Sequence, residues 1–305
     1  GVSSLGGLTL GAYLGTGIVG DSNFEVVNSG NVTISSTTAV SGPITIYGGN
    51  IDVTNNLTTS NSGDLKLLAS GNLVLKSNRV LLTTDGGDVA LLSDVDGEGT
   101  GQFRVENGVQ VNSSGGNITI AGGDNTGSGF ASGALAGRYE GIRMEGDLDF
   151  LSGGGDIVLR GKSAQVITSE GNAGIGIYNS ASTLDIDSGA GSITLQGVSQ
   201  SWNNSYLNYD AGIYLDGTHK ITSSKTTGEA IRIIADGMGS SLDTPNNFGF
   251  GEGWFSAGTT TIQSTSGGFI TLDAYATTRE GDQQNLEIFG DLNILSSSGA
   301  INING

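Results

Sequence analysis

The chain has 305 residues, of which 54 are Gly, 2 are Pro and none is Cys, and 14% are charged. This composition excludes a helical protein and a disulfide framework, whereas Val, Ile and Thr separated by Gly, Asn and Asp are typical of short strands and tight turns. The formal net charge of −18 argues against nucleic acid and anionic membrane as partners, because both would repel an acidic surface.

The first 20 residues carry no charge and include seven Gly. They lack the positive region of a signal peptide, and no run of 18 apolar residues occurs in the chain, so we expect no membrane insertion. We interpret residues 1–23 as an end cap or as a segment that docks on a neighbouring subunit.

A strand motif then recurs, in which Gly lies two positions before the first of two alternating apolar residues. The spacing of the copies varies from 21 to 39 residues, and only one copy, with Glu229, lacks the Gly. A constant unit at variable spacing predicts one repeated element joined by loops of different length. The nine copies begin their apolar pattern at Ile44, Leu65, Val89, Ile118, Ile157, Ile193, Ile231, Ile270 and Ile301.

Two further strands precede the motif in the later repeats. The segment GIRMEGDLDF (141–150) aligns without gaps with GWFSAGTTTI (253–262) and NLEIFGDLNI (285–294), and with GIGIYNSASTLDI (174–186) across a corner insertion. Side chains alternate between the two faces of a strand, which divides one repeat into core and surface. We predict as core Ile142, Met144, Leu148, Phe150, Ile157 and Leu159, and as surface Arg143, Asp149 and Val158.

Three short strands cannot bury an apolar face alone, but successive repeats can stack around a shared core. The sequence therefore predicts an all-β protein, a single-stranded right-handed parallel β-helix (solenoid) with about nine three-strand coils. The right hand follows from the crossover rule for parallel strands. We expect one domain over 24–305, with bare coils in 24–92 and loop-decorated coils in 93–305. Long loops on one flank of the C-terminal two-thirds are expected at 121–140, 160–173, 196–211, 235–252 and 273–284.

These loops hold many of the aromatic residues, which could form a platform for a surface glycan or a protein receptor. The alternative, which we favour, is that the rings pack on one another and shield the sheet beneath. The candidate binding residues are Trp202, Tyr206, Tyr209, Phe248 and Phe250.

Asp149 and Asp185 occupy equivalent outward positions, so stacking brings two carboxylates together as in a retaining glycosidase. Lys220 follows at the next equivalent position and can neutralise the pair. We favour a solvated polar ladder, and keep a polysaccharide lyase or glycoside hydrolase as the alternative from another class.

The segment DVDGEG (94–99) places Asp94, Asp96 and Glu98 around a Gly, as calcium loops do, but lacks the spacing of an EF-hand. A turn is the favoured interpretation, with weak calcium binding left open and no other cofactor expected. His219 is the single histidine, aligns with the inward Leu148, and cannot build a zinc site alone. We expect a backbone group to satisfy it.

Glycosylation sequons begin, for example, at Asn31 and Asn117. Both lie in predicted strands, so we interpret these residues as members of hydrogen-bonded ladders rather than glycan sites. The last repeat ends without a polar cap, so either the chain is part of a longer repeat array or another subunit covers that edge. In the second case we expect end-to-end self-association into a fibre.

The phrases SGNVTI (29–34), SGDLKLLASGNLVL (62–75), GGNITI (115–120) and GSITLQG (191–197) resemble those of the filamentous haemagglutinin-like β-strand-repeat proteins of bacteria. The resemblance covers most of 24–305. It implies a secreted, non-enzymatic, extracellular protein of the cell surface, acting as a segment or subunit of a surface fibre or adhesin. A carbohydrate-binding module without chemistry is a third possibility.

Overall fold

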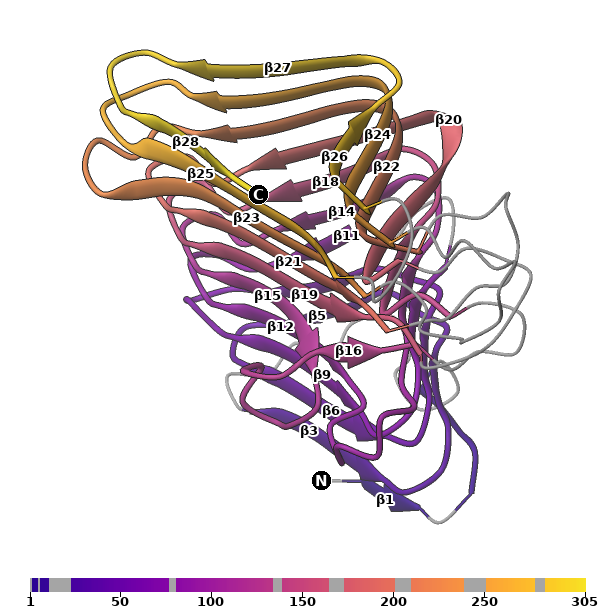
Figure 1. Cartoon of the computed structure of the whole chain (residues 1–305). Coiled ribbons are helices and arrows are strands. Elements are labelled where there is room, and N and C mark those ends of the chain that lie inside the picture. The colour runs from indigo at the N-terminus through magenta and orange to yellow at the C-terminus, as the bar shows by residue number, and fades with distance from the viewer. Residues whose placement is uncertain are drawn as a thin grey trace, which may run out of the picture.

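The computed structural model of the chain describes residues 2–4, 6–10, 23–76, 81–133, 139–164, 173–200, 210–238, 251–277 and 283–305. In these ranges the regular elements are all β-strands, and every strand pairing is parallel (Figure 1). They contain no helix that is long and apolar enough to cross a membrane. The all-β class predicted from composition is therefore confirmed, with the strands in two parallel sheets.

The first sheet has twelve strands and follows the length of the molecule. Its strands, in spatial order, are β1 (Val2–Ser4), β3 (Phe24–Asn28), β6 (Ile44–Gly48), β9 (Leu65–Ala69), β12 (Val89–Ser93), β15 (Ile118–Gly122), β19 (Ile157–Lys162), β21 (Ile193–Ser199), β23 (Glu229–Met238), β25 (Phe269–Thr277) and β28 (Ile301–Asn304), with β16 (Ala131–Ser132) paired to β19.

The second sheet has sixteen strands and consists of two rows that meet in long strands. One row contains β2 (Leu8–Thr9), β4 (Val32–Ile34), β7 (Ile51–Val53), β10 (Leu73–Leu75), β13 (Phe103–Val105), β17 (Ile142–Met144) and β26 (Gln283–Ile288). The other contains β5 (Thr38–Val40), β8 (Leu57–Thr59), β11 (Leu81–Thr83), β14 (Val109–Asn112), β18 (Leu148–Leu151) and β27 (Asp291–Ser296). The strands β20 (Ile175–Asp187), β22 (Asp210–Ser223) and β24 (Gly251–Ser264) run through both rows.

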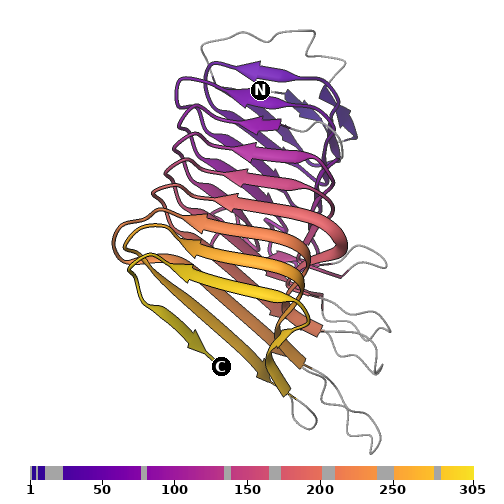
Figure 2. The same cartoon turned by 90° about the horizontal axis from the view of Figure 1, so that it is seen from above.

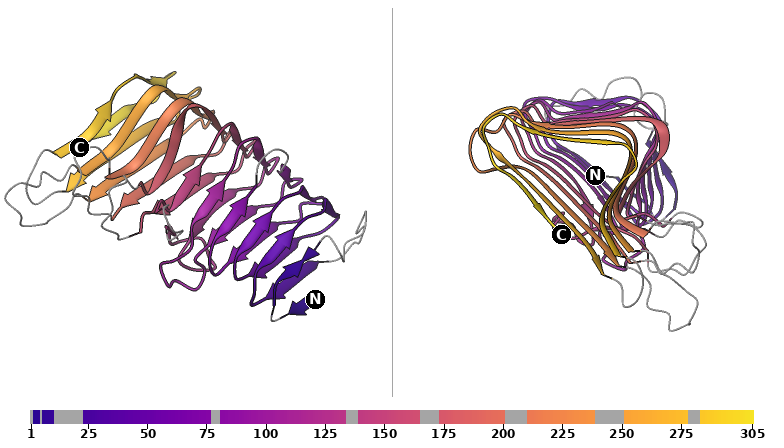
Figure 3. Two further views of the ribbon diagram at one scale, coloured as in Figure 1. Left: turned by 90° about the vertical axis from the view of Figure 1, so that its right-hand side faces the viewer. Right: turned by 45° about the horizontal axis from the view of Figure 1, so that its top comes forward.

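The chain visits the three rows in turn, and we call one such round a rung. Rungs succeed one another along an elongated body with the two ends of the chain at opposite ends (Figure 2). Seen obliquely from one end, the three rows surround a common interior (Figure 3). This arrangement is consistent with the predicted parallel β-helix.

The nine predicted motif strands form one continuous row in the predicted register. Ile118 pairs with Ile157, Ile157 with Ile193, and the series continues in both directions from Ile44 to Ile301. Two more strands, β3 and β1, extend this row beyond Ile44 without the Gly motif. They were not predicted because the sequence before them lacks that signal.

The interior is one continuous apolar cluster. All six core residues predicted in the repeat of 141–159 are at most 2% exposed, which confirms their inward orientation. The three residues predicted to be on the surface are partly exposed.

Close approach of successive rungs explains the Gly of the motif. A Cβ on Gly155 would lie 2.1 Å from the carbonyl oxygen of Gly116, and a Cβ on Gly116 would lie 2.2 Å from that of Gly87. Only Gly therefore fits without moving backbone against backbone. The exceptional copy, with Glu229, coincides with a shift in register between β23 and β25.

Replacing Gly155 by Ala is expected to lower the free energy of unfolding by about 1–3 kcal/mol, because the added methyl forces two rungs apart. Urea titration followed by circular dichroism measures the change. Gly7→Ala is the control, since a Cβ at Gly7 meets no atom within 4 Å, and it should change stability by less than about 0.5 kcal/mol. Equal losses in the two variants would refute the close-approach explanation.

Polar ladders run along the corners between rows. The side-chain oxygen of Asn31 accepts the backbone N–H of Asn50 at 3.1 Å, and that of Asn117 accepts the N–H of Asp156 at 2.8 Å. Both sequon residues thus belong to ladders, as predicted. Inside the corner before six of the motif strands, hydroxyls donate to motif Gly carbonyls, as Ser188 does to Gly191 at 2.7 Å. These bonds satisfy polar groups that the corners would otherwise bury unpaired.

The predicted loop boundaries are wrong on the first sheet. The loop predicted at 196–211 begins after β21, which extends to Ser199, and β23 and β25 likewise continue into the loops predicted at 235–252 and 273–284. Gly197 falls within the loop predicted at 196–211, but a Cβ on it would lie 2.0 Å from the carbonyl oxygen of Gly212. Gly is needed there because the strand ends approach the next rung closely, not because a loop begins.

Candidate functional site

The aromatic residues predicted to form a binding platform, Trp202, Tyr206, Tyr209, Phe248 and Phe250, lie outside the described residues. On the described part of the same flank, Tyr275 of β25 is 44% exposed. The platform therefore remains a prediction, and the candidate sites below are built from other side chains.

The outward ladder with the two acids is in the predicted register. Asp149 of β18 pairs with Asp185 of β20, which pairs with Lys220 of β22. The side-chain amide of Gln110 donates to Asp149 Oδ2 at 3.1 Å. Burial raises the pKa of Asp185, the charge of Lys220 opposes this, and Asp187 and Asp149 add to it.

A carboxyl with a raised pKa beside a second carboxylate can hold a proton at higher pH than a free aspartate. Asp185 Oδ1 is buried without a hydrogen-bond partner among the described residues. The pocket described below is lined by neither acid. The ladder therefore places Asp149 and Asp185 side by side, as predicted, but neither carboxylate lines the pocket.

The acidic segment 94–99 forms a closed turn. Asp94 is 1% exposed, and its Oδ1 accepts the backbone N–H of Gly99 at 2.9 Å and of Thr100 at 3.2 Å. Burial raises the pKa of Asp94 although these bonds oppose it. Asp96 Oδ1 lies 3.4 Å from the N–H of Glu98. The described residues contain no group of three or more His, Asp or Glu placed to hold a metal, and calcium binding at this turn stays a prediction.

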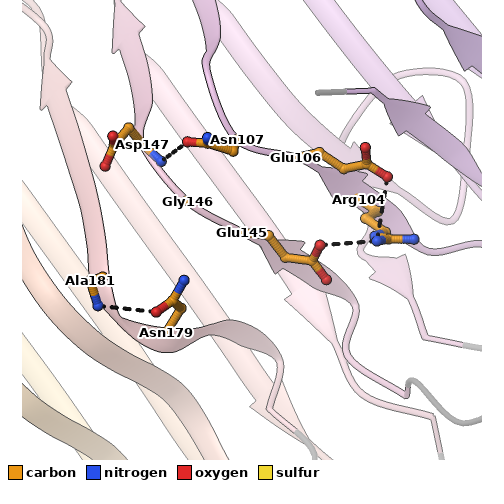
Figure 4. Close-up of a pocket in the computed structure, with 8 residues that line it drawn as sticks. All are labelled: Arg104, Glu106, Asn107, Glu145, Gly146, Asp147, Asn179 and Ala181. Carbon is orange, nitrogen blue, oxygen red and sulfur yellow. Dashed lines mark hydrogen bonds and ion pairs between the residues drawn. The ribbon is translucent and has the colours of Figure 1, made fainter. Parts of the chain in front are cut away.

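A pocket of about 460 Å³ opens at the corner between the two rows of the second sheet (Figure 4). It extends over three successive rungs. The β13–β14 corner contributes Glu106 and Asn107, the β17–β18 corner contributes Glu145 to Asp147, and β20 contributes Asn179 and Ala181. Arg104 of β13 completes the lining. The volume lies within the range of small-molecule sites, and the lining is polar.

One side of the pocket comes from an irregularity in β20. The register between β20 and β22 shifts after Tyr178 and resumes at Thr183, so the four residues 179–182 stand opposite the single residue Gly217 of the next rung. Asn179 Oδ1 accepts the backbone N–H of Ala181 at 3.1 Å, and Ser182 Oγ accepts that of Gly146 at 3.1 Å. These bonds fix the insertion against the rung below.

Two arginines in neighbouring rungs form an ion-pair network at the end of the pocket. Arg104 and Arg143 pair in register, and Glu145 bridges them, with Oε2 2.9 Å from Arg104 Nη2 and Oε1 2.6 Å from Arg143 Nε. Glu106 lies 3.4 Å from Arg104, and Glu140 lies 2.8 Å from Arg143. Burial alone would raise the pKa of Glu145, but bonds from Arg143 and Arg104 lower it to about 2. Glu145 is therefore ionised at neutral pH.

A third corner ladder runs past the pocket. Asn107 Oδ1 accepts the backbone N–H of Asp147 at 2.8 Å, and Asp147 Oδ1 accepts the hydroxyl of Thr183 at 2.7 Å. Gly146 has a φ of +87°, and a Cβ there would lie 2.4 Å from the side chain of Asn107. These contacts hold the lining side chains in place before any ligand arrives.

Sequence analysis did not identify the pocket residues. The usable signal was the corner insertion in 174–186, which was recognised only as a departure from the alignment. A scan against family models, a search of curated proteins and a search of solved structures each found no match. Function is therefore argued from the geometry and from the sequence resemblance.

Proposed function

We propose that this protein is a non-enzymatic, extracellular structural or adhesive protein, a segment or subunit of a bacterial surface fibre or adhesin. It would be built as a single-stranded right-handed parallel β-helix. The observation that carries the proposal is the unbroken register of the nine motif strands from Ile44 to Ile301. The resemblance to filamentous haemagglutinin-like proteins supports the same conclusion.

The mechanical basis is a set of hydrogen-bond ladders that all run along the long axis. Parallel backbone pairing, corner Asn and Asp side chains, and buried Ser and Thr hydroxyls each link one rung to the next. The continuous apolar interior adds burial in the same direction. Such a body resists extension along its axis and needs no disulfide or metal for rigidity.

We propose that copies associate end to end through the last described rung. Ile301 and Ile303 of β28 occupy inward positions of the row and are 42% and 55% exposed among the described residues, so a further rung, from a second copy or from a continuation of the chain, would cover them. The outer edge of β28 also offers unpaired backbone groups to a parallel neighbour. A second copy supplies both an apolar face and a pairing strand.

Electron microscopy at increasing protein concentration tests this proposal. We expect rods that join lengthwise into filaments, because each contact leaves a free end for the next copy. Ile303→Asp should abolish the filaments, whereas Asn302→Asp, which adds the same charge on the outward side of β28, should retain them. Rods that stay separate at every concentration, or filaments that tolerate both substitutions, would reject end-to-end association.

The alternative function is a polysaccharide lyase or glycoside hydrolase. The raised pKa of Asp185 beside Asp149 favours it, because such enzymes pair an acid with a carboxylate. The side-chain amide of Gln110 donates a hydrogen bond to Asp149, and Lys220 is the next residue of the ladder after Asp185. Neither acid lines the pocket. The geometry therefore favours the structural proposal.

A further inference from the structure

We infer that the pocket at the corner of β13, β17 and β20 binds a short stretch of a neutral glycan. The inference rests on the proposed adhesive role, for which it supplies a specific contact.

The shape fits an extended ligand that lies along the molecular axis. The lining comes from Glu106 in one rung, Gly146 in the next and Asn179 in the third. Neighbouring parallel strands are about 4.8 Å apart, so the pocket offers similar backbone corners at a spacing close to the length of a sugar ring. The volume of about 460 Å³ lies within the range of pockets that hold small organic ligands.

The charge favours a neutral ligand over an ionic one. Three carboxylates line the pocket, from Glu106, Glu145 and Asp147, which disfavours acidic sugars. Both glutamates already pair with Arg104, and Asp147 accepts two bonds from Thr183. The three carboxylates and one arginine leave a net charge of −2 on the lining, but each carboxylate already has an ion-paired or hydrogen-bonded partner in the protein, which reduces what a basic peptide would gain by pairing with it.

The polar groups suit hydroxyls, which donate and accept at once. The amide of Asn179 uses its oxygen for Ala181, so its nitrogen is left as a donor on the pocket lining (Figure 4). Carboxylate oxygens of Glu106 and Asp147 provide acceptors on the opposite side. The small residues Gly146, beside Asp147, and Ala181, beside Asn179, leave room for the flat face of a ring.

The test is a nuclear magnetic resonance titration of the full chain, which follows the backbone amides of Gly146, Asp147 and Ala181. The probes are cellobiose, maltose and N,N′-diacetylchitobiose, with digalacturonic acid and tetralysine as charged probes. We expect at least one neutral disaccharide to shift these amides in a saturable way and to be recovered uncleaved. Asn179→Ala should weaken that binding about tenfold, since it removes one directional donor.

The matched control is Asn55→Ala, at the equivalent corner of the β7–β8 rung, where the side chain also makes one hydrogen bond to backbone. It should bind like the wild type. The inference is overturned if no neutral disaccharide shifts the three amides, if a charged probe binds more tightly there, or if both Asn variants weaken binding equally. Rods and filaments without sugar binding would leave the structural proposal intact and reject only the pocket.

Discussion

Replacing Phe150 by Ala is expected to lower the free energy of unfolding by about 3–5 kcal/mol, the largest effect of any single substitution proposed for this chain. Phe150 is fully buried and is one of the largest side chains of the interior. Its row neighbours Val111 and Ile186 are held at fixed register, so the rungs cannot collapse into the space that the ring leaves.

Urea titration of the purified variant measures this loss. Val158→Ala is the control, because Val158 lies on β19 of the same rung and faces outward between Thr119 and Thr194. It should lose less than about 1 kcal/mol. If Val158→Ala proved as damaging as Phe150→Ala, the assignment of inside and outside in this rung would be wrong.

The fold was predictable because its strongest constraint is local. In most motif copies a Gly contacts the carbonyl of the rung below, and the strand that follows it alternates between core and surface residues. The sequence therefore shows a recurring Gly followed by apolar residues two positions apart. Where the Gly is absent, the signal is lost. Phe24 of β3 pairs with Ile44 but has no Gly before it, so β3 was not predicted.

The strand ends could not be predicted, for a different physical reason. Gly161 and Gly197 are conformationally permissive residues, and in a sequence they indicate a turn as readily as a strand. Here a Cβ on Gly161 would lie 2.2 Å from the carbonyl oxygen of Gly174. Whether Gly marks a turn or a close contact depends on a partner that is distant in the sequence.

The pocket was hidden for a related reason. Its side chains are ordinary corner residues in their own rungs, and Asn107 or Asp147 alone predicts only a turn. The hollow exists because residues 179–182 stand where the next rung has only Gly217, and the register brings three corners together. The ladder of Asp149 and Asp185 was predictable, in contrast, because every member follows from one gap-free alignment.

Replacing His219 by Leu is expected to remove a large part of the acid sensitivity of the protein. His219 is 1% exposed and lies in the row between Leu184 and Thr260, at the inward position predicted for it. Neither ring nitrogen makes a hydrogen bond of normal geometry among the described residues. Burial, partly opposed by the main chain of Asp216, lowers the pKa of His219 to about 4.

The direction of the effect follows from proton binding. An unfolded histidine has a pKa of about 6.5, so between pH 6.5 and about 4 the unfolded chain binds a proton that the folded chain does not. The stability linked to His219 is complete above pH 6.5 and is lost as the pH falls towards 4. At about 1.4 kcal/mol per pH unit, the loss amounts to about 3 kcal/mol. Asp185 and Asp236 have pKa values raised by burial and act in the opposite direction, but they are present in both proteins and cancel in the comparison.

Urea titrations of wild type and His219→Leu at pH 7, 6, 5 and 4 measure this difference. At pH 7 the variant should be at least as stable as the wild type, because Leu matches Leu184 in the neighbouring rung and removes unpaired polar atoms from the core. At pH 4 it should exceed the wild type by about 3 kcal/mol more than at pH 7. Val158→Ala keeps His219 and should follow the wild-type pH profile. Parallel profiles for wild type and His219→Leu would mean that the buried imidazole takes up its proton without unfolding, which a histidine enclosed among apolar rungs should not do.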